Sequence, residues 1–202
     1  MDELYRFDMA VFKDVNVGLH SAWLDPIFLI ITYTGLSNAE ILVTLTICFT
    51  QWLRIRRYKG GAATAPRPLW PFMKLYILPI WLAIFISGLP MAQGLKALIA
   101  RDRPSNLAIA YPEEHWRLGS FPSGHTSVAS SIAFLVLIWT WGTPRAKWGW
   151  VAVLWAVLVG VSRIYRGVHW PTDVIAGLFN GLFSAALTVL IFRLADPAPQ
   201  HS

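Results

Sequence analysis

The residues best suited to chemistry in this sequence are two histidines, an aspartate, three cations and a Ser-Gly pair between positions 96 and 173. They are Lys96, Arg103, Ser123, Gly124, His125, Arg163, His169 and Asp173. A site with three cations favours a multiply charged anion, because Arg holds phosphoryl oxygens through two N–H groups and Lys supplies a point charge. This set therefore indicates a phosphate-binding site, provided that the fold brings its members together.

The two histidines suit the two roles of a phosphoryl transfer. His169 precedes Asp173 by four positions, and Pro171 between them is typical of the first turn of a helix. This spacing allows Asp173 to contact one ring nitrogen of His169, which would fix the tautomer and leave the other nitrogen free to attack phosphorus. His125 then remains as the acid that protonates the leaving oxygen.

Ser123 is expected to be the N-cap of a helix that opens with Gly124 and His125. The free backbone N–H groups at such a helix start would point at an anion. Together with the cations, they would stabilise the phosphoryl oxygens in the transition state.

Five apolar segments are expected to position these residues. The expected membrane spans are 36–53, 75–100, 125–142, 148–161 and 172–195. A helix needs about 20 residues to cross the hydrocarbon, so the fourth span is long enough only if residues 162–165 extend it. Pro79 and Pro90 are expected to bend the second span. The sequence shows no strand-like alternation and no internal repeat, which predicts an all-α integral membrane bundle.

The whole chain, 1–202, is expected to form a single membrane domain. Its N-terminal segment 1–35 is expected to lie at the membrane interface, because the apolar stretch 26–34 is too short to cross alone. The bundle would cover 36–195, followed by a tail at 196–202. Residues 1–25 are too polar for the apolar core of a signal peptide, so the first span is expected to act as the membrane signal.

Composition supports a membrane protein and argues against nucleic-acid binding. Of the 202 residues 55% are hydrophobic and 14% charged, with 11 Trp and a mean hydropathy of +0.50, whereas soluble domains carry about 25% charged residues. The net charge of +6 comes from cations that lie between apolar runs rather than along one polar face, as topology signals do. Cys48 is the only cysteine, so neither an intrachain disulfide nor a cysteine-rich metal site is expected.

The loop charges predict an orientation. The loops after the first and third expected spans carry cations and no acid; these are Arg54, Arg56, Arg57, Lys59, Arg67, Arg145 and Lys147. The positive-inside rule makes this side cytoplasmic. The N-terminus and all eight candidate residues would then lie at the outer, periplasmic face of the inner (plasma) membrane, where alternating helix ends bring them together.

These segments resemble the three signature motifs of the type 2 phosphatidic acid phosphatase superfamily, K-x6-RP, PSGH and SR-x5-H-x3-D. The first is met by Lys96 with Arg103-Pro104, the second by 122–125, and the third by Ser162-Arg163 with His169 and Asp173. Three motifs in order and at the right spacing over 96–173 are a specific signal, unlike any one alone. Soluble haloperoxidases and acid phosphatases share the family, but the five expected spans indicate its membrane branch.

The resemblance implies a metal-independent lipid phosphatase without a cofactor. It implies that His169 is the nucleophile that forms a phosphohistidine, that Asp173 orients it, and that His125 is the general acid. The phosphate would be held by Lys96, Arg103, Ser123, Gly124 and Arg163. The short loop 105–120 leaves no added domain for a large headgroup, which favours undecaprenyl diphosphate or a glycerolipid phosphate (phosphatidylglycerol phosphate or phosphatidic acid). Lipid A is the alternative substrate.

Two other functions stay open from the sequence: a transporter or flippase that binds a lipid headgroup, and a membrane scaffold that has lost catalysis. The Gly177-x3-Gly181 pair permits close helix packing and is compatible with a homodimer. Charged residues without a motif role are interpreted as solvated or headgroup-contacting side chains; they are Arg101, Arg117, Arg166, Glu113 and Glu114.

Overall fold

The computed structural model describes residues 2–60, 65–114 and 119–195, and within these ranges all regular structure is helical. Along the chain the elements are α1 (Asp2–Phe12), η1 (Lys13–Val17), α2 (Leu24–Thr34), α3 (Ser37–Arg57), α4 (Leu69–Phe72), η3 (Met73–Ile77), α5 (Leu78–Ile86), η4 (Ser87–Gln93), α6 (Gly94–Ile99), η5 (Pro104–Asn106), α7 (Gly124–Thr140), α8 (Ala146–Tyr165) and α9 (Pro171–Ala195). The all-α prediction is confirmed. The expected tail at 196–202 lies outside the described residues.

Elements α4 to α6 form one helix of 31 residues, Leu69–Ile99. Pro90 lies inside the π-helical stretch η4, and Pro79 is the second residue after the π-helical stretch η3. A proline cannot donate the hydrogen bond of a regular turn, and a π-helical turn accommodates that loss without ending the helix. The two prolines therefore change the winding of the second expected span while it continues past them.

The expected spans correspond to helices, although not every helix is long and apolar enough to cross a membrane by itself. Three described helices are each long and apolar enough to cross a membrane: Leu69–Ile99, Ala146–Tyr165 and Pro171–Ala195. Helices α2 and α3 pass together, bent by 62° at their junction, and α7 is apolar but has only 17 residues. Residues 162–165 extend α8, which the fourth expected span needed in order to be long enough to cross the membrane. The expected number of membrane spans, about five, is thus approximate.

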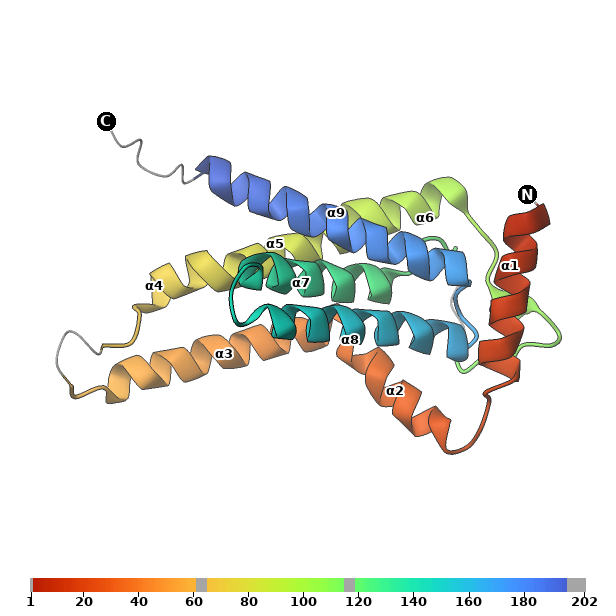
Figure 1. The fold of residues 1–202 in the computed structure, drawn as a ribbon, viewed down its shortest axis with the longest axis horizontal. Coiled ribbons are helices and arrows are strands. Elements are labelled where there is room, and N and C mark those ends of the chain that lie inside the picture. Colours follow the sequence, from red (N-terminus) through yellow and green to blue (C-terminus); the bar gives the residue numbers. More distant parts are fainter. Residues whose placement is uncertain (1, 61–64, 115–118, 196–202) are drawn as a thin grey trace.

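Helix α7 lies between α8 and α9 at the centre of the bundle (Figure 1). Its small side chains allow this close approach, and a Cβ on Gly181 of α9 would lie 2.6 Å from the backbone nitrogen of Ser131. A Cβ on Gly177 would lie 2.9 Å from Ser123 O. Both glycines therefore serve packing within one chain, and the homodimer gains no support from them.

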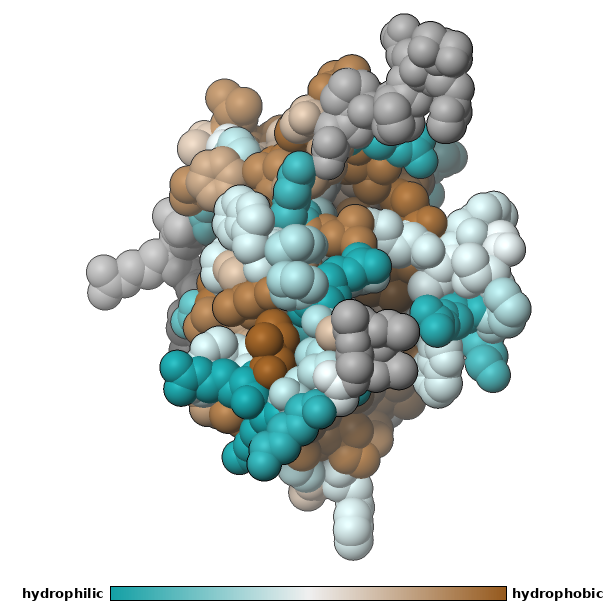
Figure 2. Space-filling view, turned by 90° about the vertical axis from the view of Figure 1, so that its left-hand side faces the viewer, coloured by the Kyte–Doolittle hydropathy of each residue, from teal (hydrophilic) through white to brown (hydrophobic). Residues whose placement is uncertain are grey.

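The N-terminal residues pack across the end of the bundle where α9 begins (Figure 1). Phe12 is fully buried and its ring lies 5.5 Å from that of Trp170, while the buried Asn16 side chain donates to the backbone oxygens of Tyr111 and Tyr165. This segment thus contributes to the core, and its location at a membrane interface stays a prediction. The opposite end of the molecule shows hydrophilic residues among hydrophobic ones (Figure 2).

Candidate active site

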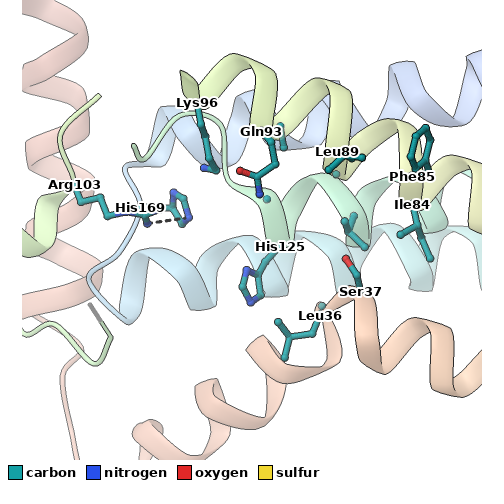
Figure 3. A pocket seen from close by; sticks show the side chains of 15 residues that line it. Leu36, Ser37, Ile84, Phe85, Leu89, Gln93, Lys96, Arg103, His125 and His169 are labelled. Carbon is teal, nitrogen blue, oxygen red and sulfur yellow. Dashed lines mark hydrogen bonds between the residues drawn. The ribbon is translucent and has the colours of Figure 1, made fainter. Parts of the chain in front are cut away.

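A pocket of about 390 Å³ lies where α6, α7 and the α2–α3 junction meet (Figure 3). Five of the eight predicted residues line it: Lys96, Arg103, Gly124, His125 and His169. The remainder of the wall is mostly apolar and comes from Gly35, Leu36, Ser37, Ile84, Phe85, Gly88, Leu89, Ala92, Gln93 and Val128. The pocket therefore has a basic, histidine-bearing end and an apolar end.

Lys96 and Arg103 are held at the basic end by backbone carbonyls. The Lys96 ammonium donates to Gly119 O and Ser120 O, both at 3.2 Å, and to Pro122 O at 2.5 Å. Arg103 donates to Val168 O at 2.8 Å and to Gly119 O at 3.1 Å. Burial, followed by the charge of Arg163, lowers the pKa of Arg103 to about 10, so it stays a cation at neutral pH.

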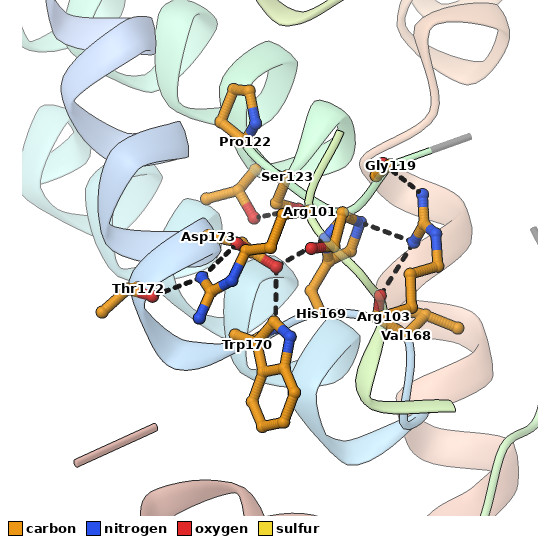
Figure 4. A network of polar contacts seen from close by, with 12 residues as sticks. Arg101, Arg103, Gly119, Pro122, Ser123, Val168, His169, Trp170, Thr172 and Asp173 are labelled. Atoms are coloured by element: carbon orange, nitrogen blue, oxygen red, sulfur yellow. Dashed lines mark hydrogen bonds and ion pairs between the residues drawn. The ribbon is translucent and has the colours of Figure 1, made fainter. Parts of the chain in front are cut away.

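His169 and Asp173 meet as their spacing predicts (Figure 4). The Nδ1 atom of His169 lies 3.4 Å from Oδ2 of Asp173, and the opposite ring nitrogen, Nε2, lies 3.4 Å from Arg103 Nη1. The carboxylate is fixed from its own helix start, because Oδ2 accepts the backbone N–H of Trp170 at 2.9 Å. A proton on Nδ1 would face the carboxylate, which leaves the lone pair of Nε2 on the pocket side.

His169 is 97% buried among cations, and both conditions disfavour its charged form. Burial first, and then the charges of Arg163, Arg103 and Lys96, lower the pKa of His169 well below its usual value. A histidine that stays neutral at physiological pH keeps the lone pair that a nucleophile needs.

Arg101 also contacts the Asp173 carboxylate, which the sequence did not reveal. Its Nη1 donates to Asp173 Oδ1 at 2.7 Å, and its Nη2 donates to Asp8, a fully buried carboxylate on α1. Asp8 in turn accepts the backbone N–H of Thr172 at 2.9 Å. The interpretation of Arg101 as a solvated side chain is therefore wrong, because two buried carboxylates bind its guanidinium.

Ser123 is the N-cap residue of α7, as predicted, and Gly124 and His125 form its first turn. Within the described residues its hydroxyl caps no backbone N–H and instead accepts the Thr126 hydroxyl at 2.9 Å. The backbone N–H of Ser123 donates to Asp173 O at 3.0 Å, which ties the start of α7 to the start of α9. Gly124 and His125 reach the pocket, whereas the fully buried Ser123 side chain does not line it.

Arg163 is 99% buried and pairs with an acid outside the motifs. Its Nη1 and Nη2 donate to the two carboxylate oxygens of Glu114 at 3.0 and 2.9 Å, and Nη1 also donates to Thr32 at 2.6 Å. Arg166 donates to the same carboxylate at 2.7 Å. The interpretation of Glu114 and Arg166 as solvated side chains is thus wrong, because Glu114 pairs with the buried Arg163 and Arg166 pairs with Glu114. The same interpretation is confirmed for the exposed Glu113, and Arg117 lies outside the described residues.

The described residues include one cluster with the donor set of a metal site, formed by His20, Asp25 and Glu113. Their ligand atoms lie within 4.8 Å of one another. None of the three lines the pocket, where cations rather than acids gather. Asp25 accepts the Tyr165 hydroxyl at 2.6 Å, which gives it a structural partner.

Comparisons with known proteins place these features in a family. The family model described as PAP2 superfamily matches residues 73–196, which confirms the resemblance seen in the motifs. The chain is similar to the putative undecaprenyl-diphosphatase YbjG of Escherichia coli, at 31% identity over 94% of this chain and 85% of that protein. It is also similar to an undecaprenyl-diphosphatase of Sulfolobus acidocaldarius, at 35% identity. That match covers 53% of this chain and only about half of the relative, 51%.

A solved structure shows the same fold over nearly the whole chain. It is a transmembrane PAP2-type phosphatidylglycerolphosphate phosphatase from Bacillus subtilis, with a TM-score of 0.70 and 23% identity. The superposition covers 98% of this chain and 90% of that one. With three long apolar helices and this neighbour, the chain is a membrane protein.

Proposed function

Because the chain belongs to the PAP2 superfamily, we propose that it is a membrane lipid phosphatase that hydrolyses a lipid phosphate or diphosphate through a phosphohistidine. The observation that carries this proposal is the two-ended pocket. A neutral histidine and two cations occupy one end, and aliphatic and aromatic side chains line the other. One end suits a phosphate and the other a hydrocarbon chain.

The apolar end continues onto the outer surface of the bundle. Phe85 and Leu89 line the pocket and are 55% and 61% exposed, as side chains that face lipid would be. A lipid could therefore enter from the membrane plane with its chain along η4 and its phosphate beside His125 (Figure 3). A water-soluble phosphoester would gain nothing from this wall.

In the first chemical step, Nε2 of His169 attacks the terminal phosphorus. A P–N bond forms while the P–O bond to the lipid breaks. His125, which is protonated once the negatively charged phosphate lies beside it, donates that proton to the leaving oxygen. Asp173 stabilises the positive charge that develops on the His169 ring across the 3.4 Å contact. Arg103 would exchange its contact with His169 for the incoming phosphoryl oxygens.

In the second step, a water molecule attacks the phosphohistidine and His125 accepts its proton. The P–N bond breaks, inorganic phosphate leaves, and His169 returns to its neutral form. No redox change or external donor is needed. Among the described residues, the possible metal-ligand cluster is formed by His20, Asp25 and Glu113 and not by the residues assigned to these steps, and we propose that the reaction uses no metal and no cofactor.

The phosphoryl oxygens would be bound by Lys96, Arg103 and the backbone N–H groups at the start of α7, with Ser123 and Gly124 shaping that turn. In this proposal Arg163 is the third cation that binds the phosphoryl oxygens. Its Nη atoms are engaged by Glu114 and Thr32, but its buried Nε has no hydrogen-bond partner among the described residues.

Undecaprenyl diphosphate is the substrate we favour. The relative that matches 94% of this chain carries that substrate in its name. Phosphatidylglycerol phosphate and phosphatidic acid are the next candidates, and lipid A phosphate is the alternative. A headgroup-binding transporter or flippase is the non-enzyme alternative.

We further propose that residues 1–202 act as a single phosphatase domain in the inner (plasma) membrane, with the pocket facing the periplasm. The partners are then the lipid substrate and membrane lipids, with no nucleic acid. The cation-rich loops on the side opposite the pocket support this orientation. A homodimer stays a prediction.

The test is phosphate release by the purified protein in detergent from undecaprenyl diphosphate, phosphatidic acid, phosphatidylglycerol phosphate and lipid A. We expect release from at least one lipid, none from His169→Ala, and inhibition by orthovanadate, which mimics pentacoordinate phosphorus. A thermal unfolding curve shows that the variant is folded. If folded wild type releases phosphate from no lipid but binds one of them, the transporter alternative replaces the enzyme. Release that survives His169→Ala would refute the assigned nucleophile.

A further inference from the structure

A second cavity, of about 840 Å³, lies at the end of the bundle opposite the pocket (Figure 2 shows this end). Its walls come from the first turns of the Leu69–Ile99 helix, the last turns of α7 and the last turns of α9. Thr188 in this wall follows Asp173 by fifteen residues in α9, which places it roughly 22 Å along the helix from the His169 site. The two cavities are therefore separate sites.

Among the described residues, the lining of this cavity holds three cations and no acid; the cations are Arg67, Lys74 and Arg193. They come from two different helices and the loop before one of them, so the fold brings them together. Between them the wall is apolar and aromatic, with Leu75, Val189, Phe192, Trp70 and Trp139. A cavity with a basic rim and an apolar interior suits a molecule that carries negative charge next to hydrocarbon.

Thr188 provides an independent indication that the cavity holds a ligand. Its side chain is fully buried and lines the cavity, and its hydroxyl has no hydrogen-bond partner among the described residues. Other hydroxyls in these helices donate to a carbonyl of their own helix, as Ser184 does to Asn180 O and Thr140 to Val136 O, both at 2.8 Å. A buried hydroxyl without a partner is costly, so a ligand oxygen in the cavity would stabilise it.

We propose that this cavity binds an anionic phospholipid of the surrounding membrane. The headgroup phosphate would be bound by Arg67, Lys74 and Arg193, an ester oxygen would accept the Thr188 hydroxyl, and an acyl chain would follow the apolar wall. Exposed Trp70, at 65%, lies at the rim in the position of an interfacial aromatic anchor. The site is independent of the phosphatase reaction proposed above, because it contains none of the residues assigned to it.

The test compares lipid binding to the purified full-length protein by native mass spectrometry, with phosphatidylglycerol and phosphatidylcholine titrated separately. Phosphatidylglycerol is a phosphodiester and serves as a probe that is not one of the candidate substrates. The test variant is Arg67→Gln/Lys74→Gln/Arg193→Gln. The matched control, Arg54→Gln/Arg57→Gln/Arg145→Gln, removes the same charge from the same end but leaves the cavity lining intact. Thr188→Val is a milder second variant.

We expect wild type to bind phosphatidylglycerol in preference to phosphatidylcholine. The cavity variant should lose about tenfold or more in affinity for phosphatidylglycerol, given the attraction of each cation near a membrane to anionic lipid, and the control should lose much less. Thr188→Val should lose about twofold to tenfold, as expected for one hydrogen bond. Equal losses in the two triple variants would show general surface attraction and overturn the proposal. Unchanged binding in the cavity variant or in Thr188→Val would also overturn it, and unchanged unfolding temperatures would show that each variant is folded.

Discussion

At the scale of single residues, the candidate nucleophile depends on a chain of contacts that starts at the N-terminus. Asp8 binds Arg101, Arg101 binds one oxygen of Asp173, and the other oxygen faces Nδ1 of His169. Each carboxylate in this chain is fully buried, so Arg101 offsets charge that would otherwise be unpaired. Because Arg101 does not line the pocket, it acts on the reaction by positioning Asp173.

We predict that Arg101→Gln lowers kcat by about 10- to 100-fold, the range seen when a residue that supports a reacting group is removed. KM should change little, because the pocket lining is intact. Asp8→Asn should show a smaller effect of the same kind, and the double variant should be no slower than Arg101→Gln, since both changes break one chain. Arg6→Gln, an exposed arginine on the same helix as Asp8, is the control. Additive losses in the double variant, or a loss confined to KM, would contradict this positioning role.

The protonation of His169 gives a second prediction at this scale. Its pKa is lowered by burial and by the charges of Arg163, Arg103 and Lys96, and a backbone hydrogen bond with Ser120 opposes them. The neutral ring should therefore persist well below its usual titration range, and its ring nitrogens should not titrate between about pH 5.5 and 8. Nitrogen NMR of histidine-labelled protein checks this, with His169→Gln used to assign the signal. A midpoint near pH 6.5 would refute the neutral nucleophile.

The same residues show how far the sequence could predict the site. The motif residues and the His169–Asp173 contact follow from local spacing, because four positions span one helical turn. The contacts of Arg101 with Asp8 and of Arg163 with Glu114 join positions that are 93 and 49 apart in the sequence. Pairs of this kind carry no local pattern, so the sequence misassigned Arg101, Arg166 and Glu114 as solvated side chains.

At the scale of helices, hydropathy predicted where most of the spans lie, because burial in lipid demands long apolar runs. It predicted less about how the helices end and join. The 62° bend between α2 and α3 and the π-helical turns beside Pro79 and Pro90 depend on packing against neighbours. The Gly177-x3-Gly181 pair predicted close helix packing without a partner, and in the structure Gly181 makes this contact with α7 of the same chain.

We predict that Gly181→Ala destabilises the protein by about 1–3 kcal/mol, the usual cost of overpacking a tight core. The added Cβ would lie 2.6 Å from the backbone nitrogen of Ser131, which cannot move without shifting α7. Gly94→Ala is the matched control, because a Cβ there meets nothing within 4 Å. Thermal unfolding in detergent compares the two variants. If Gly181→Ala and Gly94→Ala unfold at the same temperature, this contact does not limit the packing of α7 and α9.

At the scale of the whole molecule, the two ends of the bundle have different chemistry. One end holds the pocket, the N-terminal helix and the ion pairs that lie behind the histidines. The other holds the second cavity and loops in which cations occur without acids. The first end suits a site for phosphate, and the second suits the cytoplasmic, anionic surface of a membrane.

The orientation that follows can be tested with single cysteines, because Cys48 is the only native one. In a Cys48→Ser background, Glu113→Cys adds a thiol at an exposed position beside the pocket end, and Arg145→Cys adds one at the opposite end. The test uses cells whose outer barrier has been permeabilised and whose inner membrane is intact. If the pocket faces outward, a membrane-impermeant maleimide should label Glu113→Cys in these cells and Arg145→Cys only after lysis. The reverse pattern would place the reaction on the cytoplasmic side. An outward pocket would act on lipid phosphates at the outer surface, as recycling of a lipid carrier after glycan transfer requires.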